Sequence, residues 1–400
     1  MNTLAFAHLR RRLALALTAL CGALPMAAQT VTLAPGTPQD VGMSPAVLEA
    51  GVGLYREAVA RGDLVGAVLL VARNGKVVLH EAVGSRHWEA NLPMEKNTMF
   101  RMASNTKPVI ATAVSILVER GKLRYADPVR KYIPSFDNYK SGFITIGQLL
   151  SHTSGFRINT LFLEPYLAKS KEHPDAPSLQ LEVARFGAVG AEVAPGTTYS
   201  YSNPGFNTLG ALVEIAGGKP LDIFLRDEIY GPLGMVDTYN HEVAGKLDGK
   251  LSRMGAVYYA KKDGKWTAGW KPGDEPQVPF VRASGGLIST AADYAIFLQT
   301  FLNGGSYGTV TLLKPATVTS MTSVHTPPVP GSAGGYGYGW TLDGDGIYSH
   351  GGSDGTFAWV DPSRQIIGLV FTQTPSGANP RQKFMDLVRL SVMDQPRARP

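Results

Sequence analysis

Ser104 and Lys107 lie three residues apart in FRMASNTKPVIA, where an apolar run with helical spacing begins. Residues i and i+3 share one face of a helix, so the serine hydroxyl and the lysine amine can meet. A helix N-terminus favours an oxyanion, and together with burial it disfavours the ammonium form of Lys107. A neutral lysine could accept the serine proton and create a nucleophile. The same stretch also fits a helix cap followed by a solvated lysine, and alone it does not distinguish a catalytic pair from this structural alternative.

A second candidate stretch is PGTTYSYSNPGFNTLG, residues 195–210, in which Tyr201-Ser202-Asn203 lies between prolines and glycines before a predicted helix. A phenol near a lysine can ionise more easily, so Tyr201 is a possible general base. Asn203 offers an amide donor and a carbonyl acceptor to a substrate. A packed tyrosine with an asparagine that caps the helix explains the same residues.

The third stretch, SHGGSDG at residues 349–355, follows a predicted strand. Its glycines would let the strand approach a substrate closely and donate a backbone N–H, while His350 could bind substrate or hold a loop. GGSDG also fits the G-x-S-x-G motif with Ser353 as nucleophile, but such hydrolases carry their histidine after the serine. The last histidine here is His350, so that interpretation fails. His152, in LLSHTSG, is assigned a structural role.

Together, S-x-x-K, Y-S-N and H-G-G occur in the order typical of the serine β-lactamase and penicillin-binding-protein superfamily. The chain resembles the class C branch, which includes family VIII carboxylesterases, D-amino-peptidases and β-lactamases. The resemblance extends from about Gly42 to Leu390 and rests on RMASNTK, LLSHTSG, PGTTYSYSN, PLGM, SGGLIST and HGG. It implies an α+β fold of the β-lactamase/transpeptidase type, with the active site between an antiparallel sheet flanked by helices and a mainly helical domain.

The resemblance also implies roles for the residues of these motifs. Ser104 would be the acylated nucleophile, and Lys107 and Tyr201 would share its proton, with the identity of the base left open. The backbone N–H groups of Ser104 and Ser353 would form the oxyanion hole, and no metal or organic cofactor would take part. The substrate-binding residues would be Asn203, His350, Gly351, Gly352 and Ser353.

One departure from the family pattern concerns the substrate. β-Lactamases and D,D-peptidases usually carry Lys-Thr-Gly where this chain has His350-Gly351-Gly352, which removes the lysine charge that helps to bind a substrate carboxylate. We therefore predict a secreted serine hydrolase that acts on carboxylic esters through an acyl-enzyme. Two alternatives stay open: a β-lactamase or a peptidase of D-amino-acid or cell-wall peptides, and a non-catalytic penicillin-binding or sensor protein.

Strands near both chain ends, with helices between them, predict a sheet built from both ends. Ser44-Pro45 opens a helix that runs to about Arg61, and Asn74-Gly75 joins two β-branched runs as a hairpin. Further helices are predicted over 108–121, 144–155, 209–235, 292–305 and 380–393, and strands over 336–342, 346–350, 357–362 and 365–373. We predict a linker over 29–42, a sheet domain from 43–103 and 283–395, a mainly helical domain over 104–282 and a frayed tail over 396–400.

The first 28 residues have the order of a signal peptide, with Arg10, Arg11 and Arg12 before the apolar run LALALTALCGALPMAA. Cleavage near Ala28 predicts a periplasmic or secreted protein with no membrane span left after removal of the leader. It also removes Cys21, the one cysteine, and lowers the net charge of +6 by three. The remaining chain would have no disulfide and no zinc-thiolate site.

The composition, 44% hydrophobic and 18% charged over 400 residues, is that of a globular protein with a large core. No lysine-rich run with interleaved aromatic residues occurs, so we expect no nucleic-acid partner. The expected partner is a small-molecule ester, amide or lactam, and the sequence gives no oligomeric state.

Overall fold

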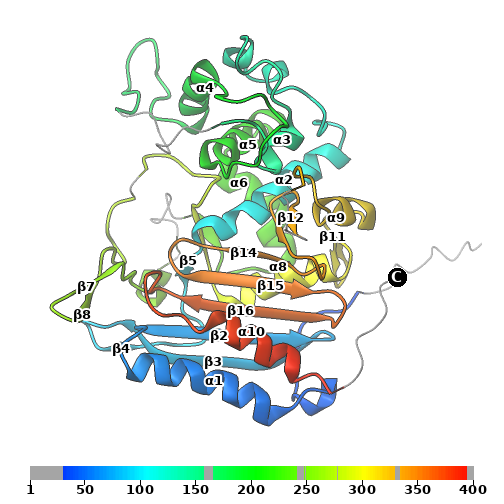
Figure 1. Ribbon diagram of the computed structural model, residues 1–400. Coiled ribbons are helices and arrows are strands. Elements are labelled where there is room, and N and C mark those ends of the chain that lie inside the picture. The colour runs from blue at the N-terminus through cyan, green and yellow to red at the C-terminus, as the bar shows by residue number, and fades with distance from the viewer. Residues whose placement is uncertain are drawn as a thin grey trace, which may run out of the picture.

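The computed structural model describes residues 30–156, 165–240, 247, 249–276, 278–328 and 334–393. The predicted signal peptide and the predicted tail lie outside these ranges. These residues form the predicted α+β fold, in which a sheet is flanked by helices and a helical region lies beside it (Figure 1).

The largest element is a nine-stranded sheet that is built from both ends of the chain (Figure 1). Its strand order is β1-β3-β2-β16-β15-β14-β13-β12, and β4 pairs with the far part of β3. Every pairing is antiparallel except that of β1 with β3. The strands are β1 (Ala34–Pro35), β2 (Gly66–Arg73), β3 (Lys76–His87), β4 (Leu92–Pro93), β12 (Gly335–Tyr336), β13 (Thr341–Leu342), β14 (Tyr348–Gly351), β15 (Thr356–Asp361) and β16 (Ile366–Thr372).

The predicted hairpin joins β2 and β3 through Asn74 and Gly75, whose φ angles are 50° and 77°. Such angles suit a tight turn that follows the twist of the strands, and asparagine and glycine tolerate them best. The prediction of this turn is confirmed.

Helices cover both faces of the sheet. The helices α1 (Pro45–Ala60) and α10 (Arg381–Leu390) pack on one face, where Leu69 belongs to their apolar cluster. On the other face Leu70 belongs to the cluster that contains α8 (Ala291–Leu302). Because successive side chains of a strand point to opposite faces, β2 is buried on both sides along its whole length.

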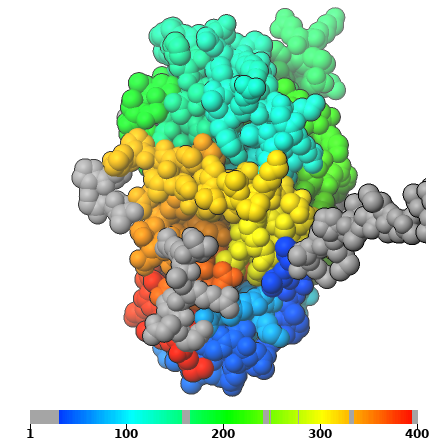
Figure 2. All heavy atoms as spheres, turned by 90° about the vertical axis from the view of Figure 1, so that its right-hand side faces the viewer, coloured from blue at the N-terminus to red at the C-terminus, as the bar shows by residue number. Residues whose placement is uncertain are grey.

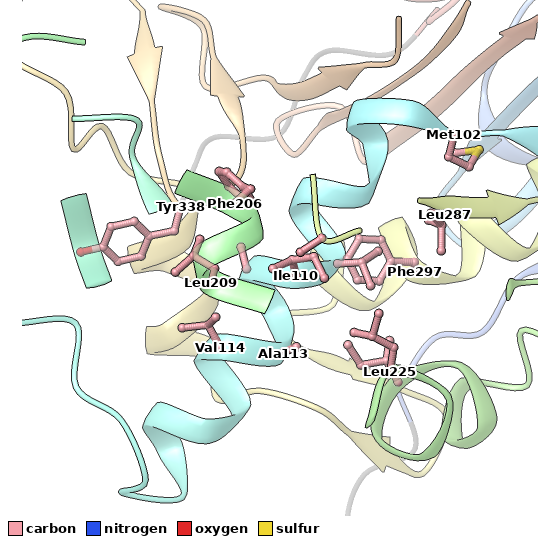
Figure 3. Packing of buried hydrophobic residues seen from close by; sticks show 14 of the residues in the cluster. Met102, Ile110, Ala113, Val114, Phe206, Leu209, Leu225, Leu287, Phe297 and Tyr338 are labelled. Atoms are coloured by element: carbon pink, nitrogen blue, oxygen red, sulfur yellow. The ribbon is translucent and has the colours of Figure 1, made fainter. Parts of the chain in front are cut away.

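Helix α2 (Thr106–Glu119) forms the centre of the helical region. All its residues from Thr106 to Leu117 are buried, as expected for a helix that is surrounded by protein. In Figure 3, Ile110 of α2 lies between Leu209 and Phe297 of α8, and Val114 lies on the side of Leu209; all four belong to one apolar cluster. The other helices of this region are α3 (Ile146–Leu150), α4 (Leu179–Val189), α5 (Asn203–Gly217), α6 (Leu221–Leu225), a π-helix (Arg226–Tyr230) and α7 (Gly231–Leu233).

Some predicted helix bounds are wrong. The helix expected over 144–155 spans only 146–150, because His152 adopts φ 58° and the chain turns there. The helix expected over 209–235 already begins at Asn203, and it is interrupted at Gly218, whose left-handed conformation caps α5. Helix α4 was not predicted. The described part of the predicted linker contains β1 and a 3-10 turn at Gln39–Val41.

Short sheets surround the central one. Strand β9 (Leu287–Ser289) lies between β5 (Phe100–Arg101) and β6 (Tyr239–Asn240). Two hairpins are formed by β7 (Ala260–Lys262) with β8 (Lys265–Thr267) and by β10 (Ser306–Tyr307) with β11 (Val310–Thr311), and α9 is Pro315–Met321. Figure 2 shows the blue and red segments from the two chain ends together at one end of the molecule. The division into two domains stays a prediction.

Candidate active site

Ser104 lies on the 3-10 turn Ala103–Asn105, which leads directly into α2. The turn is attached to β9 on both sides: Met102 N–H donates to Leu287 O at 2.8 Å, and Leu287 N–H donates to Thr106 Oγ1 at 3.0 Å. Ala103 adopts φ 44°, a left-handed conformation that is rare for a residue with a side chain. Ser104 itself is half-buried.

Lys107 is fully buried, with 0% of its surface exposed, and its amine contacts three oxygen atoms. Nζ lies 2.9 Å from Ser104 Oγ, 2.8 Å from Asn203 Oδ1 and 2.8 Å from Ser284 O. Burial lowers the pKa of Lys107 well below its usual value, and the positive charge of Arg282 acts in the same direction. A neutral amine can donate to Asn203 and Ser284 while its lone pair accepts the Ser104 proton.

The third predicted residue, Tyr201, also reaches this pair. Lys107 Nζ lies 4.7 Å from the centroid of the Tyr201 ring, and the phenol hydrogen bonds with the Ser104 side chain. Burial raises the pKa of Tyr201, and the hydrogen bond with Ser104 opposes this effect only in part. The phenol is therefore protonated at neutral pH. The residue as a whole is 42% exposed, whereas its hydroxyl is buried against Ser104.

Helix α5 fixes the position of Tyr201 and Asn203. Ser202 caps this helix by accepting a hydrogen bond from Gly205 N–H at 3.0 Å, and Asn203 is the first helical residue. Ser202 N–H in turn donates to His152 Nδ1 at 3.0 Å. The residue that caps the helix is thus Ser202, whereas sequence reasoning considered Asn203.

The ring of His152 packs against the ring of Tyr201. Its ring is fully buried, with its centroid 4.2 Å from that of Tyr201. Because Nδ1 accepts the hydrogen bond from Ser202, the neutral ring carries its proton on Nε2. Burial lowers the pKa of His152 well below its usual value. Sequence reasoning gave this residue a structural role, and only its place in LLSHTSG could have linked it to the site.

The turn after β14 lies against the segment that carries Ser104. A Cβ at Gly352 would be 2.3 Å from Met102 O, so only glycine allows this approach. Thr356 Oγ1 accepts from Asn105 Nδ2 at 2.9 Å and donates to Met102 O at 3.0 Å. Within the described residues, the backbone N–H groups of Ser104 and Ser353 donate to no protein acceptor. They are therefore available to an oxyanion.

His350 is buried next to this turn, and both of its ring nitrogens have protein partners. Nδ1–H donates to Gly351 O at 2.8 Å, and Nε2 accepts from the Tyr336 hydroxyl at 2.9 Å. Burial lowers the pKa of His350 to about 3. A neutral His350 supplies no positive charge to a substrate, and its hydrogen bonds hold the strand instead.

In the described ranges, no group of three or more His, Cys, Asp or Glu side chains is arranged to hold a metal ion. None of the helices in those ranges has both the length and the apolar character needed to cross a bilayer.

A sheet flanked by helices, with a serine, a buried lysine and a tyrosine in contact, defines the class of serine hydrolases with a β-lactamase/transpeptidase fold. The family model described as Beta-lactamase matches residues 53–390, and the chain belongs to this family.

Individual relatives include hydrolases of several kinds. An N-acetylmuramyl-L-alanine amidase of Bacillus subtilis (strain 168) is 29% identical over 340 residues, which cover 75% of each chain. The esterase EstB of Burkholderia gladioli is 34% identical over 194 residues, 46% of this chain and 49% of EstB. Among solved structures, EstCE1, a hydrolase with promiscuous acyltransferase activity, superposes with a TM-score of 0.72 at 23% identity, over 87% of this chain and 99% of its own. This structural likeness shows the fold.

Proposed function

We propose that this protein is a carboxylesterase that hydrolyses its substrates through an acyl-enzyme on Ser104. The observation that carries the proposal is the 2.9 Å contact between Ser104 Oγ and the amine of Lys107, which is buried and has its pKa lowered. Burial that favours a neutral amine provides a base at neutral pH, and the adjacent hydroxyl is the group it can activate.

In the proposed acylation step, Lys107 takes the Ser104 proton while Oγ attacks the ester carbonyl. The negative charge that develops on the carbonyl oxygen is stabilised by the backbone N–H groups of Ser104 and Ser353. The protonated Lys107 returns its proton through the Tyr201 hydroxyl to the leaving alcohol, and acyl-Ser104 remains. Water then attacks the acyl carbonyl, its proton follows the same groups back to Ser104 Oγ, and the acid leaves. We favour Lys107 as the base, since the raised pKa of Tyr201 opposes a phenolate.

The choice of esters rests on the charge at the site. His350 occupies the position of the lysine in Lys-Thr-Gly, it is neutral, and its nitrogens are engaged by the protein. A substrate without a carboxylate loses nothing at such a position. The similarity to the esterase EstB supports the same choice.

A second candidate is the hydrolysis of D-amino-acid amides or cell-wall peptides. It is favoured by the Bacillus subtilis amidase, which this chain matches over a larger share of its length than EstB. The positive charge of Arg282, close enough to lower the pKa of Lys107, also lies near the site.

A substrate panel separates the candidates. We expect p-nitrophenyl butyrate to be turned over, nitrocefin and D-amino-acid amides to react much more slowly, and Ser104→Ala to abolish turnover. Intact-mass spectrometry during turnover should show one acyl group, absent in Ser104→Ala. Stable labelling by a fluorescent penicillin without turnover would instead indicate a binding or sensor protein, and full activity in Ser104→Ala would refute the mechanism.

We also propose that the protein is exported, with residues 1–28 as its signal peptide. The order of three arginines, an apolar run and small residues supports this. Sequencing the N-terminus of the mature protein tests it, and a mature chain that still begins at Met1 would contradict it.

A further inference from the structure

A buried ion pair lies beside the candidate active site and has no part in the mechanism above. Arg101 Nε is 3.0 Å from Asp354 Oδ2, and only 7% and 8% of the two side chains are exposed. The Tyr259 hydroxyl donates to the other carboxylate oxygen, Asp354 Oδ1, at 3.0 Å. The guanidinium of Arg101 lies 4.8 Å from the ring centroid of Trp270.

The pair connects the two segments that carry the proposed oxyanion hole. Arg101 ends β5, three residues before Ser104, and Asp354 directly follows Ser353 in the turn between β14 and β15. Backbone hydrogen bonds hold the two ends of this turn, since Gly352 N–H donates to Thr356 O and Gly355 N–H donates to Gly352 O. The tip of the turn, at Ser353, is fixed to the nucleophile segment through the Asp354 side chain.

Stability alone does not explain this arrangement. Burying two charges removes their hydration, and a well-packed apolar pair usually stabilises a fold at least as well. Among the described residues, Asp354 is the only carboxylate paired with Arg101, and the guanidinium nitrogen Nη1 is buried without a partner there. What a charged, directional pair adds is a defined geometry, which is the property that an oxyanion hole requires.

We infer that Arg101 and Asp354 are positioning residues that set the Ser353 N–H relative to Ser104 for stabilisation of the oxyanion. This inference rests on the proposed function. Through Tyr259 and Trp270, which precede β7 and follow β8, the pair also attaches this hairpin to the oxyanion turn. Loss of the pair should therefore weaken binding of the transition state more than binding of the substrate.

The test compares Asp354→Asn with a matched change at the other end of the same strand. Asp361 ends β15, its side chain is 1% exposed, and it pairs with Arg364 at 3.0 Å, remote from the Ser104 segment in the strand register. For each variant we would measure the melting temperature, kcat and KM for p-nitrophenyl butyrate, and the Kd of a phenylboronic acid. A boronate bonded to Ser104 Oγ places an oxygen where the oxyanion would form.

We expect Asp354→Asn to lower kcat and to weaken boronate binding, each by about 10- to 100-fold, with KM within about twofold of wild type. Asp361→Asn should lower the melting temperature and leave kcat and the boronate Kd unchanged. Wild-type boronate affinity and kcat in a folded Asp354→Asn variant would overturn the inference.

Two further variants keep the test decisive. If Asp354→Asn does not fold, Tyr259→Phe removes one hydrogen bond to the carboxylate without unpairing a charge. It should lower kcat about three- to tenfold, and an unchanged kcat would reject the inference. Ser104→Ala, assayed in parallel, separates failure of the proposed function from failure of the inference. An active Ser104→Ala refutes the proposed function, and with it the inference. An inactive Ser104→Ala beside an unaffected Asp354→Asn or Tyr259→Phe refutes the inference alone.

Discussion

The change Gly352→Ala tests how closely the oxyanion turn must approach the nucleophile segment. The added Cβ would lie 2.3 Å from Met102 O and 2.4 Å from Thr356 Oγ1. A carbon and an oxygen need about 3.3 Å, so the turn has to move by about 1 Å. A displacement of that size at a catalytic group costs about 100-fold in rate, and overpacking adds about 1–3 kcal/mol of destabilisation.

The assay is kcat for p-nitrophenyl butyrate together with the melting temperature. Gly285→Ala is the control, since it is the same substitution beside the same segment but its nearest atom, the carbonyl carbon of Ala103, would be 3.6 Å away. We expect the control to keep wild-type kcat. A folded Gly352→Ala variant with kcat within twofold of wild type would show that the turn does not need this approach, and that our account of the oxyanion hole is wrong.

Four further changes probe the proton path and its electrostatics. Lys107→Met should lower kcat by about 10³-fold or more. In wild type, the unfolding free energy should rise with pH above the lowered pKa of Lys107, because only the unfolded chain still binds a proton there, and the variant should lose this rise. Tyr201→Phe keeps the ring on His152 but removes the hydroxyl, so kcat should fall about 10²- to 10⁴-fold at an unchanged melting temperature. His350→Asn should reduce the loss of unfolding free energy on acidification, since with a pKa of about 3 in the folded state only the unfolded chain binds a proton at this residue between pH 6.5 and 3. Between pH 5 and 6, the slope of the unfolding free energy with pH, measured by urea titration, should be smaller in the variant than in wild type by about 1.4 kcal/mol per pH unit. An equal slope in the two proteins would exclude a buried neutral ring. Asn203→Asp places a carboxylate at the 2.8 Å contact with Lys107 Nζ, so the rise of kcat/KM with pH should move up by about 1–3 pH units, whereas Asn203→Ala should lower activity without moving it.

The sequence was informative where the chemistry depends on local spacing. Ser104 and Lys107 are one helical turn apart, so their contact follows from helix geometry once α2 is recognised. The Asn74-Gly75 turn is equally local. The contact with Tyr201 spans most of the helical region, and no spacing rule predicts it. Only the combined order of the three motifs pointed to it.

Other features of the site could not be predicted, because they leave no local pattern in the sequence. Ser284 O accepts from Lys107 Nζ, yet a carbonyl oxygen has no signature in the sequence. The short helix at 146–150 ends because His152 is left-handed, a conformation that local propensity does not assign to histidine. Arg101 and Asp354 are distant in the chain, and nothing in their neighbours indicates that they pair.

Other errors were avoidable. Ser202 followed by Pro204 is a helix-start pattern, and it places the start of α5 at Asn203 rather than at 209. Helix α4 has its cap at Ser178 and buried residues at Leu179, Val183 and Phe186, which is helical spacing. In both cases the helical pattern is present beside loop-rich sequence.

The charges around Lys107 explain why a lysine can act as a base here. Its three contacts are all neutral oxygens, and in the described part of the chain no carboxylate acts on its pKa, which burial and Arg282 both lower. A carboxylate beside the amine would hold its proton and remove the base. Asp354, which follows Ser353, is a carboxylate close to the site, and its pairing with Arg101 balances that charge. The ion pair that we infer to position the oxyanion hole therefore also keeps an uncompensated negative charge away from the amine. Arg101→Gln leaves Asp354 without its partner, so it should both slow the reaction and raise the pKa of Lys107. The pH dependence of kcat/KM separates the two effects, because the first lowers the plateau and the second moves the rise to higher pH.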